Sequence, residues 1–488
     1  MGATNLSSVT EAGNYATNAV GLIGTGAVLN LIYAMVKRRE RMKTGIPLTL
    51  AIFIMAGCAS LAAVQPGTVL WRYYGGNGIY SAPAPAPDGT IYLVSDGGLC
   101  AVTNNGVVAS NRWCFPAGGG SSPAIGPDGT IYIVGGEGNL HAMNPDGSQK
   151  WSYPAQAGQG SPGIGWDDSV YVEGYQYLYA VSASGSNKWK SAVMGSRNYS
   201  SPAVGLDGSI YVGSYEQHAF YAFASDGSQK WLRDSTFLDA VPCDSAAVAQ
   251  DGTILVTAGS LYAFAPDGTN VWRTTTNNCL GACPVIGPDG TIYAGDGGDL
   301  GLNAFKPGGG LLWHAVPAPV RYGVPSTPAV DSSGTIYYCT SNNLFAISSQ
   351  GAVKWVAPGL DVPAGFSVFG QPPLIAPDGT IYVALGGTLY AIAGTNGPAK
   401  SPWPTYRQNA RRTGKIEKPL LQQPKKRADA NFEFQLYAQI DQTQTVQTST
   451  DLVTWTALTN IAVTNVPMDV VDLCASNFPT RFYRTLSQ

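Results

Sequence analysis

Residues 121–153 read SSPAIGPDGTIYIVGGEGNLHAMNPDGSQKWSY. Short runs of β-branched and aromatic residues alternate here with turn dipeptides, a pattern typical of four short antiparallel strands. In Pro127-Asp128-Gly129, proline fixes φ, aspartate accepts local backbone hydrogen bonds and glycine supplies positive φ. A second Asp-Gly turn at Asp146 and Gly147 precedes the last strand. The first strand consists of small residues, which suits a strand packed near a central axis.

The string Pro-Asp-Gly-Thr-Ile-Tyr recurs eight times along the chain, intact or altered. It is intact from Pro87, Pro127, Pro288 and Pro377, and altered from Trp166, Leu206, Gln250 and Ser332. Its third position falls at residues 89, 129, 168, 208, 252, 290, 334 and 379. A period near 40 residues indicates a repeat architecture in which each repeat forms one four-stranded sheet.

A tryptophan marks the last strand of each repeat, usually in the pattern Gly-x-x-x-Trp. These residues are Trp71, Trp113, Trp151, Trp189, Trp231, Trp272, Trp313 and Trp355. A tryptophan buries roughly 150–250 Å², so we expect each of them to fix the packing between neighbouring sheets. The alternative is a ring of tryptophans that binds ligands.

The order of the strands predicts how the ring closes. Seven tryptophan strands lie inside the repeats, and the eighth, at Val69–Tyr73, precedes the first repeat. The last repeat stops after Leu389–Ala393 without a tryptophan strand of its own. We therefore predict an all-β fold, an eight-bladed β-propeller over residues 66–414 in which the N-terminal strand completes the last four-stranded blade. Such closure removes the open sheet edges.

This combination of motifs resembles the quinoprotein-type (pyrroloquinoline-quinone-like) propeller repeats. The stretch Trp403–Gly414 (WPTYRQNARRTG) is similar to a tail element often found with them. The resemblance implies the propeller fold. Enzymes of this superfamily are quinone-dependent alcohol and glucose dehydrogenases with a Ca²⁺ beside the quinone, held by Glu, Asn and Asp. Non-enzymatic relatives include an outer-membrane assembly lipoprotein that acts as a docking scaffold.

The chain departs from the enzymes of the superfamily. It has no adjacent cysteine pair, its blades are minimal, and the loop carboxylates Glu137, Glu173, Glu216 and Asp239 are scattered one per blade. The sequence therefore favours the non-enzymatic branch, with no catalytic residues and no cofactor. Pyrroloquinoline quinone and Ca²⁺ are expected only under the alternative, a quinone- and calcium-dependent oxidoreductase.

Charge argues against a nucleic-acid partner. Residues 66–399 hold 12 Lys and Arg against 22 Asp and Glu, a net charge of −10, which disfavours binding to phosphate backbones. Basic residues gather instead at 37–43 and 407–427.

Residues 1–65 predict export, with three possible modes of anchoring. Met42 begins a stretch that resembles a bacterial signal, and Met55–Cys58 resembles a lipobox in which Cys58 would carry lipid. Cleavage after Ala63 is the secreted alternative. In the third, the apolar stretches 19–36 and 46–64 form a transmembrane hairpin whose basic turn lies in the cytoplasm. Each alternative places the propeller outside the cytoplasm, in the periplasm, at the outer membrane or on the cell surface.

Cysteine and histidine positions give few chemical signals. Cys100 and Cys114 fall on adjacent strands of one predicted blade, so either a disulfide or buried thiols can occur there. Cys243, Cys279 and Cys283 leave the same choice, and the spacing of the last two lacks the further ligands of a zinc site. His141, His218 and His314 lie at unrelated repeat positions, so packing is favoured over catalysis. A lone aspartate in each Asp-Gly turn is expected to accept its own backbone N–H groups rather than to bind Ca²⁺.

The C-terminal part differs in composition from the repeats. Residues 415–430 are rich in Pro, Gln and Lys and predict an exposed linker. Alternating strands return over 431–488, which predicts a small β-sandwich. The stretch Ser449–Trp455 together with Arg481–Arg484 resembles a short terminal module of secreted bacterial proteins, thought of as a surface or carbohydrate-associated appendage.

The sequence thus predicts a monomeric, exported and membrane-anchored propeller that binds a protein or polysaccharide partner on one face. Polysaccharide binding or processing is a second alternative to the scaffold role. It rests on aromatic residues in the loops between blades, Tyr80, Tyr199, Phe237, Tyr322 and Phe366, which either stack on sugars or anchor their loops.

Overall fold

The computed structural model describes residues 64–76, 78–106, 108–158, 160–192, 200–205, 207–240, 242, 245–274, 282–299, 301–317, 326–340, 343–358, 360, 371–401, 404–409, 414, 420–426, 432–437, 443–450, 454–462, 468–472 and 482–487. Every regular element in these residues is a β-strand. Within them no helix is long and apolar enough to cross a membrane. Residues 1–63, with Cys58 and all three predicted anchoring modes, lie outside the described residues.

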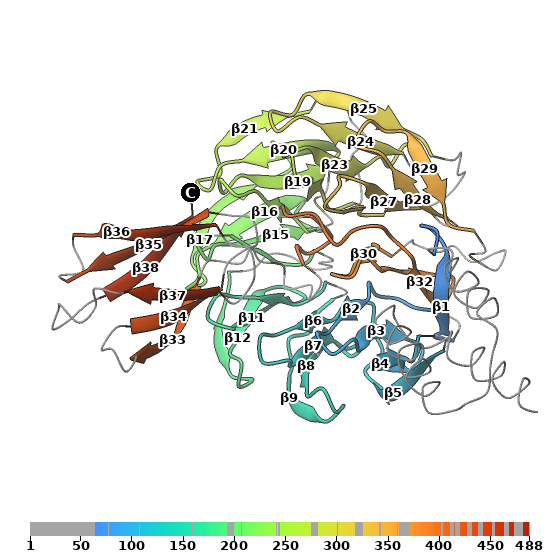
Figure 1. Ribbon diagram of the computed structural model, residues 1–488, viewed down its shortest axis with the longest axis horizontal. Coiled ribbons are helices and arrows are strands. Elements are labelled where there is room, and N and C mark those ends of the chain that lie inside the picture. The colour runs from blue at the N-terminus through green and yellow to red at the C-terminus, as the bar shows by residue number, and fades with distance from the viewer. Residues whose placement is uncertain are drawn as a thin grey trace, which may run out of the picture. The chain divides into compact units, whose positions relative to one another are not determined.

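Residues 66–400 contain eight four-stranded antiparallel sheets, which we call blades 1 to 8 in chain order. Figure 1 shows them arranged around a common centre. The first, innermost strands are β2 (Ala84–Pro85), β6 (Ala124–Ile125), β10 (Gly163–Ile164), β14 (Ala203–Val204), β18 (Ala247–Val248), β22 (Val285–Ile286), β26 (Ala329–Val330) and β30 (Leu374–Ile375). The second strands are β3 (Ile91–Ser95), β7 (Ile131–Val134), β11 (Val170–Glu173), β15 (Ile210–Ser214), β19 (Ile254–Ala258), β23 (Ile292–Gly295), β27 (Ile336–Cys339) and β31 (Ile381–Leu385).

The third strands are β4 (Gly98–Asn104), β8 (Leu140–Met143), β12 (Leu178–Val181), β16 (Ala219–Phe223), β20 (Ser260–Phe264), β24 (Leu302–Phe305), β28 (Leu344–Ile347) and β32 (Thr388–Ile392). The outer strands are β5 (Ala109–Phe115), β9 (Gln149–Tyr153), β13 (Asn187–Lys190), β17 (Gln229–Arg233), β21 (Asn270–Arg273), β25 (Leu311–Ala315), β29 (Val353–Val356) and, for blade 8, β1 (Val69–Tyr74).

The two ends of the repeat region meet in blade 8. Strand β1 pairs antiparallel with β32, with Trp71 opposite Ala391, and β32 pairs with β31 through Ala391 and Tyr382. The predicted closure, in which the N-terminal strand completes the last sheet, is confirmed. This closure gives the last sheet four strands, the number found in each of the other blades, and β1 forms its outer edge.

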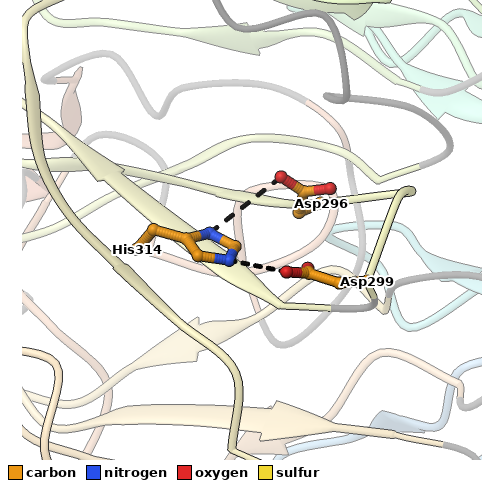
Figure 2. A group of neighbouring side chains, drawn as sticks. All are labelled: Asp296, Asp299 and His314. Atoms are coloured by element: carbon orange, nitrogen blue, oxygen red, sulfur yellow. Dashed lines mark hydrogen bonds and ion pairs between the residues drawn. The ribbon is translucent and has the colours of Figure 1, made fainter. Parts of the chain in front are cut away.

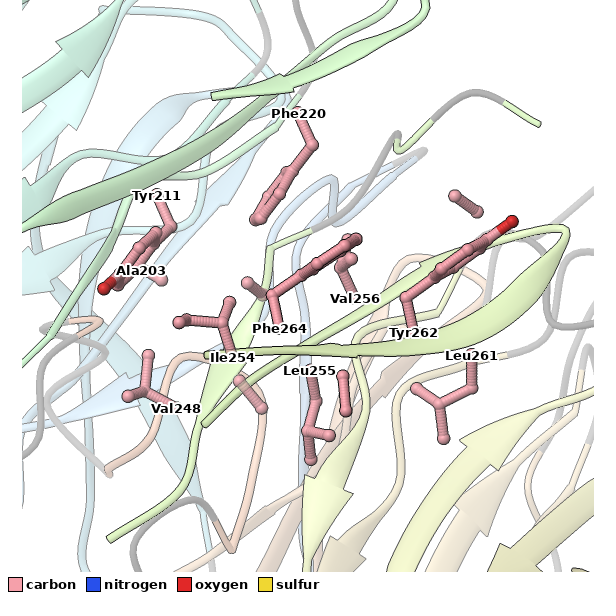
Figure 3. Close-up of a cluster of buried hydrophobic side chains, with 14 of the residues drawn as sticks. Ala203, Tyr211, Phe220, Val248, Ile254, Leu255, Val256, Leu261, Tyr262 and Phe264 are labelled. Carbon is pink, nitrogen blue, oxygen red and sulfur yellow. The ribbon is translucent and has the colours of Figure 1, made fainter. Parts of the chain in front are cut away.

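Each blade repeats one row of side chains across its strands. In blade 1, Tyr92 lies opposite Ala101, and Ala101 lies opposite Trp113. The small alanine between them lets the two rings meet at 5.8 Å between centroids. Blade 5 is the exception, because Leu255 stands in the tyrosine position. Figure 3 shows Phe264 on the opposite side of blade 5, where it packs against Phe220 and Trp231 of blade 4.

Each tryptophan also contacts the blade that follows it. A Cβ added to Gly268 in blade 5 would lie 2.7 Å from the Trp231 ring of blade 4. The Trp231 indole N–H donates to the Pro266 carbonyl at 2.9 Å. Six more tryptophan rings pack against the equivalent glycine of the following blade. These pairs are Trp113–Gly147, Trp151–Gly185, Trp189–Gly227, Trp272–Gly309, Trp313–Gly351 and Trp355–Gly67. The Gly-x-x-x-Trp pattern therefore describes two contacts, one with each neighbouring blade.

Hydroxyl groups connect the innermost strands around the ring. The backbone N–H of Ala82 donates to Ser122 Oγ at 3.0 Å, that of Ser122 to Ser161 Oγ at 2.8 Å, and that of Ser161 to Ser201 Oγ at 2.9 Å. Each serine belongs to the next blade, and each is followed by a proline that immediately precedes a first strand. These bonds satisfy backbone donors that have no partner within their own sheet.

The antiparallel order gives the ring two different faces. Connections between first and second strands, and between third and outer strands, lie at one end of every blade. Connections between second and third strands, and those leading to the next blade, lie at the other end. We call these ends the turn face and the loop face. Asp168, at the glycine position of its turn in blade 3, adopts a positive φ of 60°, so the altered string keeps the backbone shape of the intact one.

A disulfide joins Cys100 to Cys114 in blade 1. The two residues lie directly opposite each other on β4 and β5, so of the two alternatives the disulfide is the one that forms. Cys339 is buried in blade 7, and burial raises the pKa of its thiol. Cys243 and Cys279 lie outside the described residues.

The C-terminal strands form two three-stranded antiparallel sheets. One contains β33 (Leu420–Lys426), β34 (Phe432–Tyr437) and β37 (Met468–Asp472). The other contains β35 (Thr443–Ser449), β36 (Thr456–Ala462) and β38 (Phe482–Ser487). The rings of Phe434 and Tyr483 join the two sheets at 4.2 Å between centroids.

Strand β33 corrects the predicted linker, because it lies within residues 415–430 and pairs with β34. The register of this pair shifts between Gln422 and Lys425, around Pro424. Proline has no N–H to donate and is tolerated at such an irregularity. The polar composition of this segment therefore did not exclude a strand, and the sheets begin before residue 431.

Candidate functional site

The turn face repeats one polar arrangement in successive blades. In blade 2, Asp128 accepts hydrogen bonds from the backbone and hydroxyl of Thr130 at 3.0 and 2.7 Å and from Lys150 at 3.1 Å. Blade 4 repeats this with Asp207, Ser209 and Lys230. The predicted role of the turn aspartates, accepting their own backbone N–H groups, is confirmed here. The lysine that completes each arrangement precedes the tryptophan, a signal that the sequence analysis missed.

The loop face differs from blade to blade. In blade 1, Tyr80 donates to Asp96 at 2.7 Å, and in blade 3, Lys190 lies 4.4 Å from the centroid of Tyr177. Neither arrangement is repeated in the other described blades. The residues that distinguish one blade from another therefore lie on the loop face.

Blade 5 and the loop before it place one carboxylate beside a fixed cation. Asp239 accepts from Ser260 at 2.6 Å and pairs with Arg273 at 3.2 Å. The hydrogen bond from Ser260 holds the pKa of Asp239 below its usual range, with help from Tyr262 and Arg273, although burial opposes this. The group therefore stays ionised and paired.

Blade 6 gathers two carboxylates around one imidazole (Figure 2). Asp296 follows β23, Asp299 lies in the turn to β24, and His314 lies on β25. His314 Nε2 lies 2.9 Å from Asp299 Oδ2, and Nδ1 lies 4.0 Å from Asp296 Oδ2. The sequence predicts a packing role for His314 and no role in a site for the two aspartates. The spacing Asp-x-x-Asp between two strands was the available signal.

Blade 2 carries a histidine–carboxylate pair, in which His141 Nε2 contacts Glu137 Oε1. Glu137 also lines a shallow hollow of about 410 Å³ with Gly136, Gly138, Gln156, Ala157 and Tyr175. Gln156 has a positive φ of 51°, uncommon for a residue other than glycine. The hollow therefore combines an exposed aromatic ring, a carboxylate and an amide between blades 2 and 3.

The four loop carboxylates singled out in the sequence do not meet in one cluster in the described part of the chain. Glu137 and Asp239 have the partners given above, and Glu216 is exposed in the turn after β15. Glu173 is 1 % exposed at the end of β11, and of the groups around it only the backbone of Ser200 favours its charged form. Burial raises the pKa of Glu173 well above its usual range.

Two of the five predicted loop aromatics, Tyr80 and Phe237, lie among the described residues. Tyr80 is held by its bond to Asp96, and Phe237 packs on Tyr262 and Phe264 at 6.0 and 5.9 Å. Both contacts fit the loop-anchoring interpretation. Tyr199, Tyr322 and Phe366 lie outside the described residues. Tyr175 and Tyr215, in turns between second and third strands, are 53 % and 43 % exposed and were missed.

The described residues of the segment after blade 8, which are 397–401, 404–409 and 414, lie at the centre of the ring. Val330 N–H donates to Pro404 O at 2.9 Å, and Val204 N–H donates to Gly414 O at 2.7 Å. Ser401 Oγ donates to Ile286 O, and Arg407 Nη2 donates to Pro162 O. These contacts reach the first strands of blades 3, 4, 6 and 7. Figure 1 shows the orange segment inside the ring.

Arg407 is the most unusual residue of this central segment, because its side chain is fully buried. Its Nε and Nη1 atoms have no hydrogen-bond partner, and burial lowers its pKa to about 10. The arginine belongs to the tail element recognised in the sequence, and its role as a central contact was not predicted.

The fold, the repeated Tyr-Ala-Trp row and the motif spacing together define a β-propeller built from quinoprotein-type repeats. The predicted repeat type and the all-β propeller fold are confirmed. Residues 257–446, less than half of the chain, match the family described as outer membrane protein assembly factor BamB. No curated protein sequence matches the chain.

Solved structures support the fold. BamB from Moraxella catarrhalis aligns with a TM-score of 0.51 and 15% identity, over 66% of this chain and 96% of that one. Virginiamycin B lyase from Staphylococcus aureus aligns with a TM-score of 0.44 and 12% identity, over 56% of this chain and 95% of the lyase. The C-terminal WD40 domain of Sif2 aligns with a TM-score of 0.49 and 9% identity, over 68% and 97%. At such identity the first likeness shows the fold alone, and the lower scores support no argument.

Proposed function

We propose that this chain is an exported, non-catalytic scaffold whose propeller binds a protein or polymer partner through its loop face. The observation that carries the proposal is the central segment, because its described residues 397–401, 404–409 and 414 occupy the part of the ring where a quinone site would have to form. The matching family, described as an outer membrane protein assembly factor, supports a scaffold role and a location in the periplasm or at the outer membrane. Membrane attachment through residues 1–65 and a monomeric state belong to the same proposal.

The alternative of a quinone- and calcium-dependent oxidoreductase requires Glu, Asn and Asp to converge on the centre. The described central residues instead include one asparagine and no carboxylate: Ser401, Pro404, Thr405, Tyr406, Arg407, Gln408, Asn409 and Gly414. We expect no dye reduction when the purified protein is incubated with pyrroloquinoline quinone, Ca²⁺ and alcohol or glucose. Quinone-dependent reduction would overturn the scaffold proposal.

Photo-crosslinking in cells tests which face binds the partner. A photoreactive residue in place of Tyr175 samples the loop face, where the side chain is 53 % exposed. The matched control replaces Asp146, an exposed residue in a turn-face turn of blade 2. We expect a discrete adduct from position 175 and none from position 146. Adducts from the turn face alone would contradict the assignment of the binding face.

Polysaccharide binding is the second candidate, favoured by the hollow between blades 2 and 3. Its lining places the Tyr175 ring beside Glu137 and Gln156, and an aromatic face with polar neighbours suits the apolar and hydroxylated sides of a sugar. Sedimentation with insoluble polysaccharides tests it. Binding that Tyr175→Ala abolishes and Tyr74→Ala preserves supports this candidate, because Tyr74 is even more exposed than Tyr175 but lies outside the hollow.

A further inference from the structure

The loop-face end of blade 6 holds the only described group of three metal-ligating side chains whose ligand atoms all lie within 4.8 Å of one another. These are Asp296, Asp299 and His314 (Figure 2). They come from β25 and from the turn between β23 and β24, so three separate backbone positions converge. Asp296 is 8 % exposed, whereas the side chains of Asp299 and His314 are 49 % and 31 % exposed. The group is therefore anchored inside the blade and open to solvent on one side.

Hydrogen-bond polarity inside this group leaves two acceptors facing each other. Asn303 donates from Nδ2 to Asp296 Oδ2 at 3.2 Å, so its Oδ1 faces His314 Nδ1, at 2.8 Å. An amide oxygen only accepts, so Nδ1 carries the proton. In a neutral imidazole Nε2 is then a lone pair, and it lies 2.9 Å from Asp299 Oδ2, which also only accepts. Either a second ring proton or a bound cation must compensate this contact.

Charge around the group favours a bound cation. No Lys or Arg of the described chain forms an ion pair with Asp296 or Asp299. His314 lies opposite Asn303 in the same place in its blade as Arg273, which lies opposite Tyr262 in blade 5. Blade 5 thus pairs one carboxylate with a permanent cation, whereas blade 6 places two carboxylates around a side chain that is neutral when it acts as a ligand.

The neighbouring blade supports the turn that carries these carboxylates. Tyr338 of blade 7 donates to the Gly301 carbonyl at 3.0 Å. Burial raises the pKa of Tyr338, and the charges of Cys339, Asp296 and Asp299 act in the same direction. The tyrosine therefore stays a hydrogen-bond donor and fixes the end of the turn. Such second contacts orient first ligands in metal sites.

We propose that Asp296, Asp299 and His314 bind one divalent transition-metal ion on the loop face, through two carboxylate oxygens and Nε2. An imidazole ligand beside carboxylates suits Zn²⁺ or Mn²⁺, whereas Ca²⁺ and Mg²⁺ prefer oxygen ligands only. Tetrahedral Zn²⁺ with bonds of about 2.0 Å separates its ligand atoms by about 3.3 Å. The Nε2–Oδ2 distance of 2.9 Å is close to that value, and three protein ligands leave a position open to water or to a partner.

Titration calorimetry of the full chain with ZnCl₂, after EDTA treatment and dialysis, tests the site. We expect one saturable equivalent, with affinity reduced at least tenfold in Asp299→Asn and in His314→Gln. His218→Gln is the matched control, because His218 is exposed on the loop face of blade 4, and its affinity should equal that of the parent. Co²⁺ in place of Zn²⁺ should give a visible absorption spectrum that both site variants lose.

Thermal unfolding of the metal-free proteins separates loss of a ligand from loss of the fold. Asp299→Asn changes a half-exposed side chain, so its melting temperature without metal should equal that of the parent, while Zn²⁺ should raise only the parent's. Absence of saturable Zn²⁺ binding overturns the proposal. So does equal affinity in the parent and in a correctly folded Asp299→Asn. The proposal is independent of the scaffold function, because neither the metal titration nor the thermal unfolding involves a partner.

Discussion

The turn face and the loop face are built by the same blades, yet they use the same residue types differently. On the turn face, Asp128 and Asp207 accept bonds from their own turn and from a lysine of the outer strand, in nearly the same geometry. On the loop face, Asp96, Asp239 and Asp296 each have different partners. The comparison indicates that the turn-face contacts fix the turns within each blade, whereas the loop face is where one blade can differ from the next without breaking the ring.

The largest effect is expected from removing an indole that joins two blades. Trp231 contacts Tyr211, Phe220 and Phe264 at 5.9 Å each, so Trp231→Ala should reduce the free energy of unfolding by about 3–5 kcal/mol. Urea denaturation followed by circular dichroism measures the loss. Tyr74→Ala is the control, because this side chain is 69 % exposed and should change stability by less than about 0.5 kcal/mol. Similar losses in both variants would remove the special role of the tryptophan.

The second largest effect concerns the glycine that receives this indole. Gly268→Ala places a Cβ 2.7 Å from Trp231 at a φ of +84°, which should cost about 2–4 kcal/mol from overpacking and backbone strain together. Gly106 is the matched control, with a φ of +88° and nothing within 4 Å of an added Cβ. Gly106→Ala should cost only about 1 kcal/mol. Equal losses in the two variants would show that the turn, rather than the indole contact, requires glycine.

These two positions also show how far the sequence predicts the fold. Repetition in the sequence predicts the strand order, the closure by Val69–Tyr74 and the tryptophan positions. A feature that occurs eight times at the same spacing must occupy the same structural position in each blade. Gly67 precedes Trp71 with the same spacing as the other pairs and packs on Trp355, yet it was not recognised because it lies before the first intact string.

The candidate sites were harder to predict, because each occurs once. Asp299 and His314 are 15 residues apart in sequence and meet only through the pairing of β24 with β25. Arg407 reaches Pro162 across 245 positions of sequence. No local pattern encodes such contacts. The polar composition of residues 415–430 also led to a wrong prediction of a linker, since Leu420–Lys426 forms a strand.

The third prediction concerns the buried carboxylate of Glu173 on the loop face, which we expect to lower the free energy of unfolding. Glu173 occupies the position that Val94 and Val134 hold in blades 1 and 2, and its carboxylate is buried with only the backbone of Ser200 favouring its charge. Because burial raises its folded-state pKa, the folded protein keeps a proton that the unfolded chain loses above about pH 4.3, so stability falls as pH rises past that value. Glu173→Val should remove this fall and stabilise the protein by about 1–3 kcal/mol at pH 7.

Chemical denaturation at pH 4 and pH 7 measures this effect. The gain from Glu173→Val should be larger at pH 7 than at pH 4, because only the parent carries the titrating group. Glu216→Val is the control, since Glu216 is exposed in the following blade and should change stability little at either pH. A loss of stability at pH 7 in Glu173→Val would show that the carboxylate has a structural role which its buried position does not reveal.

The smallest effect is expected from a single cation of the turn face. Burial opposes ionisation of Asp207, but hydrogen bonds from Lys230 and Ser209 outweigh it and lower its pKa to about 2. A lowered folded-state pKa stabilises the protein above the unfolded value of about 3.9, and this stability is lost as pH falls towards 2. The Asp207 side chain is 48 % exposed, so solvent screens the pair, and Lys230→Met should cost less than about 1 kcal/mol at pH 7.

Acid titration of the unfolding midpoint measures this effect. The midpoint should fall less steeply between pH 4 and 2 in Lys230→Met than in the control Lys306→Met, whose exposed lysine has no ion pair among the described residues. Parallel acid profiles in the two variants would mean that the repeated lysines add solubility to the turn face without holding its turns.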